Sequence, residues 1–314
     1  MRKHRLGPAV SLALTLALTS ALTSALSAAL LALPPAPVDA AVSPVRASAS
    51  PETPTVVSIT ASHRRGHDRV VFRFDGGLPE HVSARYVDRL VGDGSGLPVR
   101  IAGQAVLRVR FSDAQAHDDS GETVAARTAY ALPNVMTTVR AGDFEAVTTY
   151  GVGLARRTRF RVSSRENPSR VVLDVRAAFR TVDREVYFFD RDAYLANEEP
   201  FFVATKRPVL PGSPATGVMD RLFAGPVPRE HADGLRLLRS HATSYDDLGI
   251  ADRIARVRLT GGCSSDGSTV TVAGEIMPTL RQFASVDWVK VLAPDGTTGS
   301  PTGNTDSIPA CLEP

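Results

Sequence analysis

Cysteine is almost absent from this sequence: 314 residues contain two, Cys263 and Cys311. The first 40 residues contain none, which excludes an acylated lipoprotein anchor. The chain also lacks a Gly-x-Ser-x-Gly nucleophile motif and a glycine-rich phosphate loop ending in Lys. Gly151-Val152-Gly153 lacks the remaining spacing of a dinucleotide-binding loop. We therefore expect no enzymatic activity and no cofactor.

Most of the net positive charge of the chain lies in its first 40 residues. The formal net charge is +3 and the pI about 9.1, but residues 1–40 hold Arg2, Lys3 and Arg5 against Asp39. The remainder is almost neutral, so the basic pI gives no reason to expect a nucleic-acid partner. With 43% hydrophobic and 22% charged residues the composition is that of a globular protein. The length favours two domains.

The N-terminal segment has the parts of a secretory signal: a basic start, a long uncharged run from 6 to 38, and Ala40 before Ala41. We expect residues 1–40 to be a signal peptide and 41–53 a flexible spacer. An uncleaved membrane anchor remains the alternative, because ~20 apolar residues can span a bilayer. The prolines at 34, 35 and 37 favour cleavage. The predicted location is secreted, cell-surface or cell wall.

Residues 54–177 alternate between apolar and polar side chains. Val70, Phe72 and Phe74 alternate with Arg69, Val71 and Arg73. Leu107, Val109 and Phe111 alternate with Arg108 and Arg110. Between Gly142 and Val175 the same period recurs: Thr158, Phe160 and Val162 fall on one side and Arg157, Arg159 and Arg161 on the other. A period of two predicts strands with one buried face. We expect an all-β sandwich with an arginine-bearing outer face.

Several motifs in this region resemble the AMIN-like domain of secreted actinobacterial proteins. The motifs are His67–Phe72, Arg85–Asp88, Gly94–Gly96 with Ala102–Leu107, Gly142–Glu145 and Gly151–Gly153. The resemblance covers 54–177 and implies a β-sandwich related to the module that localises cell-wall amidases on peptidoglycan or the septal envelope. No amidase domain follows within the chain.

Residues 184–297 predict a small α+β domain. We expect strands at Val186–Phe189, Phe201–Arg207, Ile254–Leu259, Val270–Val272 and Val286–Leu292, and helices after Ser213-Pro214 and around Glu275–Phe283. Arg221–Pro226, Thr279–Phe283 and Val286–Val291 are similar to the GerMN domain of spore-germination (sporulation) and envelope proteins. That resemblance implies a non-catalytic domain with an envelope protein partner.

The candidate binding residues are arginines. Residues 54–177 hold 18 Arg against 13 Asp and Glu, whereas 184–314 hold 13 Lys and Arg against 17 acids. Arginine pairs with carboxylates and phosphates in bidentate fashion. We predict one wall-binding face for peptidoglycan or an anionic wall polymer, formed by Arg69, Arg73, Arg108, Arg110, Arg157, Arg159, Arg161 and Arg170. A solvated sheet face of alternating charge remains the alternative.

Export predicts a disulfide between Cys263 and Cys311, which would fasten the tail 298–314. His63 and His67 are four residues apart, but the arginines and glycine between them favour a solvated loop over a metal site. Two acidic groups, Asp118-Asp119 with Glu122 and Asp246-Asp247 with Asp252, are interpreted as loop acids. The functional alternatives are a regulator or recruiter of a separate amidase and an accessory wall hydrolase with a cryptic site.

Overall fold

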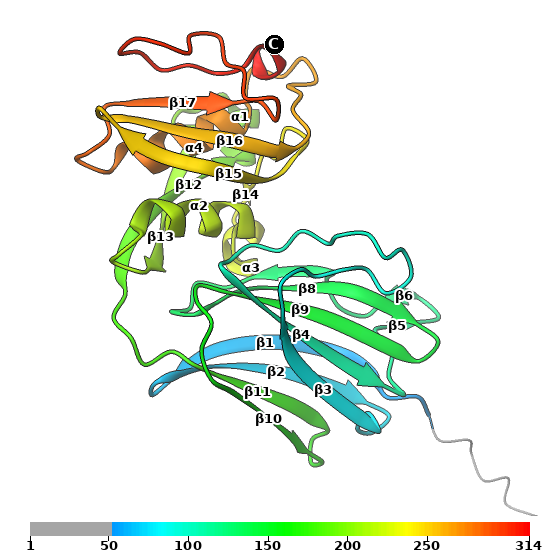
Figure 1. Cartoon of the computed structure of the whole chain (residues 1–314). Helices are drawn as coiled ribbons and strands as arrows, with labels where there is room; N and C mark the ends of the chain where they lie inside the picture. Colours follow the sequence, from blue (N-terminus) through cyan, green and yellow to red (C-terminus); the bar gives the residue numbers. More distant parts are fainter. Residues whose placement is uncertain (1–51) are drawn as a thin grey trace, which may run out of the picture. The chain divides into compact units, whose positions relative to one another are not determined.

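The computed structural model describes residues 52–314 (Figure 1). The predicted signal peptide and most of the spacer lie outside the described residues. The described residues belong to one compact unit. Within 52–314, no helix is long and apolar enough to cross a membrane.

The first part of the described chain is the predicted β-sandwich. Its first sheet has the order β1 (Thr55–Arg64), β2 (His67–Asp75), β11 (Arg170–Arg176), β10 (Phe160–Arg165). Its second sheet has the order β3 (His81–Val87), β4 (Ala105–Ser112), β9 (Val147–Leu154), β8 (Val135–Phe144), β7 (Arg127–Ala129). All these pairings are antiparallel. A small hairpin, β5 (His117–Asp118) and β6 (Gly121–Glu122), stands beside them.

The sandwich core lies between the inner faces of the two sheets. Val70, Phe72 and Phe74 of β2 are buried in one cluster with residues of β4 and β9. The rings of Phe72 and Phe111 meet edge to face at 5.0 Å between centroids. Each such side chain contributes about 1.5–3 kcal/mol through burial. The alternation predicted for β2 and β4 is confirmed.

The outer face of the second sheet is partly covered. The connection 88–104 folds over it, and Leu90, 1% exposed, packs there with Val106 and Val139. A Cβ on Gly151 would lie 2.4 Å from Leu90 Cδ2, and one on Gly153 would lie 2.0 Å from the carbonyl oxygen of Ala102. The two glycines therefore serve close packing of this connection on β9.

The second part is the predicted α+β arrangement. One sheet has the order β13 (Phe202–Val209), β12 (Val182–Asp190), β14 (Leu235–Arg236), and the other β15 (Ala242–Ala251), β16 (Ile254–Gly261), β17 (Trp288–Leu292). The helices are α1 (Arg191–Ala196), α2 (Pro214–Ala224), α3 (Pro228–Ala232), α4 (Val272–Arg281) and the 3-10 turn η1 (Ala310–Leu312). Residues of α2 and α4 share one core with β12, β16 and β17.

Two sequence predictions here are wrong. Val270–Val272 does not form a strand. Thr271 is the N-cap of α4, and an N-cap residue has the extended backbone dihedrals of a strand residue but is not paired with another strand. β15 was missed because its register shifts twice, between Ala242 and Ser244 and between Asp246 and Gly249, which breaks the period of two.

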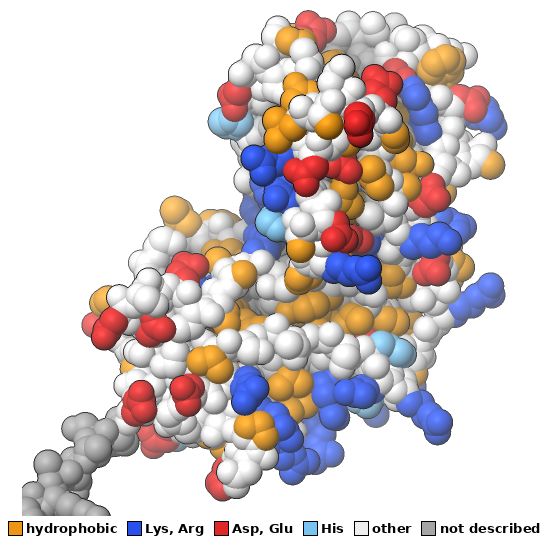
Figure 2. Space-filling model, turned by 180° about the vertical axis from the view of Figure 1, so that it is seen from behind, with side chains coloured by type: hydrophobic (Ala, Val, Ile, Leu, Met, Phe, Trp, Pro, Cys, Tyr) orange, Lys and Arg blue, Asp and Glu red, His pale blue; other side chains and the backbone are white. Residues whose placement is uncertain are grey.

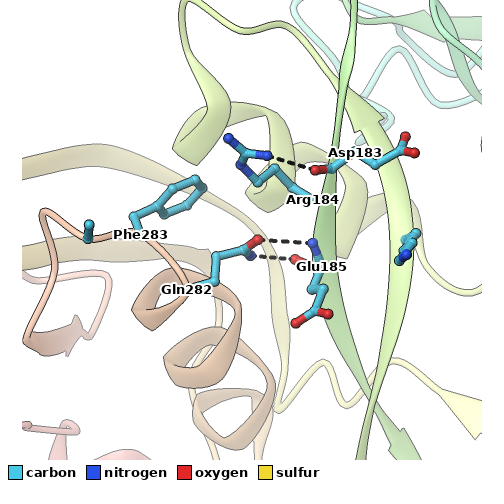
Figure 3. A pocket seen from close by; sticks show the side chains of 7 residues that line it. Asp183, Arg184, Glu185, Gln282 and Phe283 are labelled. Carbon is cyan, nitrogen blue, oxygen red and sulfur yellow. Dashed lines mark hydrogen bonds between the residues drawn. The ribbon is translucent and has the colours of Figure 1, made fainter.

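Helix α4 docks on β12 through polar side chains. Glu275 accepts from the backbone N–H of Phe189, and the Thr279 hydroxyl oxygen accepts from that of Tyr187. Gln282 pairs with both backbone groups of Glu185, as Figure 3 shows. The three side chains lie on one face of the helix because they are four and three residues apart. The helix thus satisfies strand N–H groups that β14 is too short to reach.

The C-terminal tail is fastened as predicted. Cys263 and Cys311 form a disulfide with their Cα atoms 5.7 Å apart. Ser307 bridges to β17 beside Lys290. Lys290 is 1% exposed, and its ammonium donates to the carbonyl oxygens of Ser300, Thr302 and Thr305. Backbone carbonyls around a buried cation, rather than apolar contacts, order this Gly- and Thr-rich segment.

A buried arginine joins α2 to the sandwich. Arg221 is fully buried, and its guanidinium donates to the carbonyl oxygens of Tyr130 at 2.8 Å and of Leu132. Burial lowers the pKa of Arg221 to about 9. On the sandwich side, buried Asp68 accepts from the N–H groups of Asn134 and Val135 and so holds the same 130–135 loop.

Candidate functional site

The outer face of the first sheet is open and basic. Strand alternation turns every second residue of β1, β2, β11 and β10 away from the core. These outward positions hold seven arginines, which we call the arginine face: Arg64, Arg69, Arg73, Arg161, Arg165, Arg170 and Arg176. Two acids, Asp174 and Asp75, lie on the same side. Figure 2 shows Lys and Arg side chains gathered along the lower part of the molecule, where the sandwich lies.

Three arginines stand side by side across three strands. Arg73 of β2 is directly opposite Arg170 of β11, which is opposite Arg165 of β10. Directly opposite residues have Cβ atoms about 4.5–5.5 Å apart, and like charges there destabilise a sheet. No acid stands in this row. The row therefore costs stability by itself, and an anion bound above it would relieve that cost.

A second row is partly neutralised. Arg69 forms a bidentate pair with Asp174, at 2.7 Å from Nε to Oδ1 and 2.9 Å from Nη2 to Oδ2. The hydrogen bonds to Arg69 lower the pKa of Asp174, and those to Asp174 raise the pKa of Arg69. Arg161 is opposite Asp174 on the other side. This row holds one more positive than negative charge.

The predicted set of eight arginines does not form one face. Arg69, Arg73, Arg161 and Arg170 lie together on the first sheet, but Arg108 and Arg110 are on β4 in the second. Both sheets bury their inner faces in one core, so their outward side chains point in opposite directions. The prediction of a single face is corrected in this respect.

Arg157 and Arg159 precede β10 rather than forming part of it, since that strand begins at Phe160. The Arg157 guanidinium lies 4.5 Å from the ring centroid of Tyr86, whose hydroxyl donates to the carbonyl oxygen of Thr158. The carbonyl oxygen of Arg159 accepts a hydrogen bond from the backbone N–H of Arg176, so Arg159 adjoins the end of the arginine face. The strand prediction for 157–159 is wrong because these residues form the crossing between sheets.

Three members of the arginine face were missed: Arg64, Arg165 and Arg176. Each ends a strand beside a turn, where the apolar alternation that marks a strand has run out. Their signal was present in the spacing, because Arg165 follows Arg161 by four residues and Arg176 follows Arg170 by six, both even separations.

The other candidates have structural partners. His63 pairs with buried Asp68 at 2.7 Å, and Nδ1 of His67 lies 3.2 Å from the carbonyl oxygen of Arg65. Among residues 52–314, no group of three His, Cys, Asp or Glu could hold a metal ion.

The two acidic groups differ in their placement. Asp118, Asp119 and Glu122 are exposed around the β5–β6 hairpin. Asp246 lies in β15 rather than in the predicted loop and forms a bidentate pair with Arg258.

Buried Asp220 of α2 is an unpredicted titratable group. It accepts from Gln104 Nε2 at 2.8 Å and from the Tyr245 hydroxyl at 3.0 Å. Burial raises the pKa of Asp220 to about 6. It lines a hollow of about 320 Å³ with Asp246 and Asp247.

Comparison with known proteins bears on the sandwich. No curated protein and no solved structure matches the chain. Residues 54–177, the range that holds both sheets of the sandwich, match the family model of the AMIN-like domain, and this match indicates a role associated with the cell wall and an extracellular or cell-wall location.

Proposed function

We propose that this is an exported, non-catalytic envelope protein that binds an anionic wall polymer through the arginine face. The observation that carries the proposal is the row Arg73–Arg170–Arg165, three like charges at directly opposite positions of neighbouring strands. Guanidinium groups in such a row can engage carboxylates or phosphates of a chain lying across the strands.

The contrast between the two sheets supports this assignment. The second sheet also bears outward arginines, but the connection 88–104 packs over part of its outer face. On the first sheet five of the seven arginines are exposed, and Arg69 and Arg170 are half-buried. Exposed ion pairs contribute only about 0–1 kcal/mol to stability, so fold maintenance gives little reason for so many charges on one side.

The test is charge reversal with a matched control. Arg73, Arg165 and Arg170 are changed together to Glu, which keeps three like charges in the row and inverts their sign. Binding of the mature chain to purified sacculi, measured by co-sedimentation, is expected to weaken at least tenfold, which is 1.4 kcal/mol or more. Arg108 and Arg110 changed to Glu on β4 should leave it unchanged. Equal loss in both variants, or in neither, refutes the proposal.

For the second part we propose a GerMN-like, protein-binding role, which rests on the sequence resemblance and the α+β arrangement. The partner would be an envelope protein, and a wall amidase encoded elsewhere is one candidate. Capture of that amidase by the mature chain, lost on deletion of 184–314, tests the idea.

A wall hydrolase is the second candidate function. A buried carboxyl whose pKa is raised to about 6, in a hollow with two more acids, is a possible general acid. Release of soluble muropeptides from purified wall, abolished by Asp220→Asn, would favour it. Intact wall after prolonged incubation favours the binding role.

A further inference from the structure

The hairpin tip between β8 and β9 presents an aromatic ring to solvent beside a groove. Phe144 is 70% exposed, the highest value among the large exposed hydrophobic side chains of residues 52–314. The groove has a volume of about 850 Å³ and runs from this tip past Asp143 to His117 and Arg140. It is distinct from the arginine face, because the hairpin belongs to the second sheet.

The tip is held rigidly. Asp143 accepts from the N–H of Ala116 at 2.9 Å and from the Thr148 hydroxyl at 2.6 Å, and its other oxygen pairs with His117 at 2.8 Å. The turn residues Glu145 and Ala146 both have positive φ, 49° and 54°, where hairpins usually place Asn and Gly. Because the backbone of the tip is already ordered, little backbone entropy is lost when Phe144 contacts a ligand.

The polar groups of the groove select the ligand. Arg140 is engaged by Glu122 and the carbonyl oxygen of Ala116, so it is not free to hold an anion. Glu145 is exposed and makes no hydrogen bond within residues 52–314. The groove thus offers acceptors and a flat apolar ring, and it repels phosphate or carboxylate. A suitable ligand carries no negative charge, is rich in hydroxyl and amide donors, and has one apolar face.

We propose that this groove binds a saccharide unit of the wall glycan, with the sugar face against the Phe144 ring and its hydroxyl groups donating to Glu145. The inference rests on the proposed wall-binding function and adds a neutral subsite to it. The arginine face engages the anionic groups of the polymer, and the groove engages its uncharged sugars. A short oligosaccharide contacts one ring and one free carboxylate here, so its binding is weak.

The test uses an uncharged hexamer of N-acetylglucosamine and the mature chain. Calorimetric titration is expected to show binding that falls at least tenfold in Phe144→Ala and is retained in Phe144→Tyr, which keeps the ring. Leu195→Ala is the matched control, because Leu195 is a 68% exposed apolar residue on α1. Amide shifts in NMR spectra should appear at the 142–148 hairpin.

Three outcomes overturn the proposal: no binding of the hexamer, equal affinity in Phe144→Ala, or shifts confined to other parts of the chain. A lysine-rich peptide is titrated in parallel. If it binds and Glu145→Gln abolishes that binding while the hexamer does not bind, the groove takes amines instead of sugars. Sacculus binding that still depends on Arg73, Arg165 and Arg170 would leave the proposed function standing in each case.

Discussion

Replacing Arg221 with Met should uncouple α2 from the sandwich. The substitution keeps the side-chain length but removes the donors that satisfy the carbonyl oxygens of Tyr130 and Leu132. A buried acceptor left without its partner costs about 1–3 kcal/mol, and this substitution leaves two such acceptors. We expect a loss near 4 kcal/mol against the ~5–15 kcal/mol of a typical domain. For a chain of this size that lowers Tm by about 10 °C.

The assay is scanning calorimetry of the mature chain. Because Arg221 contacts both parts, its loss should also resolve one transition into two, and should expose the segment 178–181 between β11 and β12 to protease. Arg229→Met is the control, since the Arg229 side chain is 92% exposed. A shift below about 2 °C, equal to that of the control, would show that Arg221 is not a joint between the two parts.

The remaining predictions concern other buried groups. The pKa of Asp220 in the folded protein, about 6, lies above its usual value. The stability that protonated Asp220 contributes, about 3 kcal/mol, is therefore present near pH 4 and lost as the pH rises through 6. Asp220→Asn should flatten that part of the pH profile of stability, measured by urea unfolding. Cys311→Ser opens a loop with a separation of 48 residues and should cost about 4 kcal/mol and release the tail to protease, and unchanged melting would refute the stabilising role. Gly151→Ala forces a methyl group to 2.4 Å from Leu90 and should cost about 1–3 kcal/mol in thermal unfolding, whereas Gly94→Ala, with open space around it, should cost far less.

The sandwich core was predictable because period-two alternation is a local signal. Val109 lies between Arg108 and Arg110 in the sequence, so the alternation alone predicts that it faces the core, where it is buried. The disulfide was predictable because export leaves two cysteines only each other as partners.

The arginine face was not predictable from the sequence, because the sheet to which a strand belongs depends on pairing between residues far apart in the chain. Nothing near Arg108 in the sequence says that β4 pairs with β9 while β2 pairs with β11. Outward alternation shows that a side chain leaves the core, but not on which side of the sandwich it emerges. The polar docking of Glu275 and Thr279 was hidden for a related reason: buried polar side chains look like surface residues until their partners are known.

The connection 88–104 that covers part of the second sheet also limits valency. A sandwich with two open basic faces could hold two polymer strands and cross-link them. Dissociation of such a protein from the wall would be slowed, because one face could rebind while the other stayed bound. Under the proposed function, one open basic face would hold one anionic strand, through contacts that salt screens over about 8 Å at physiological ionic strength. A protein that binds in this way would exchange between sites along the wall without cross-linking its anionic strands.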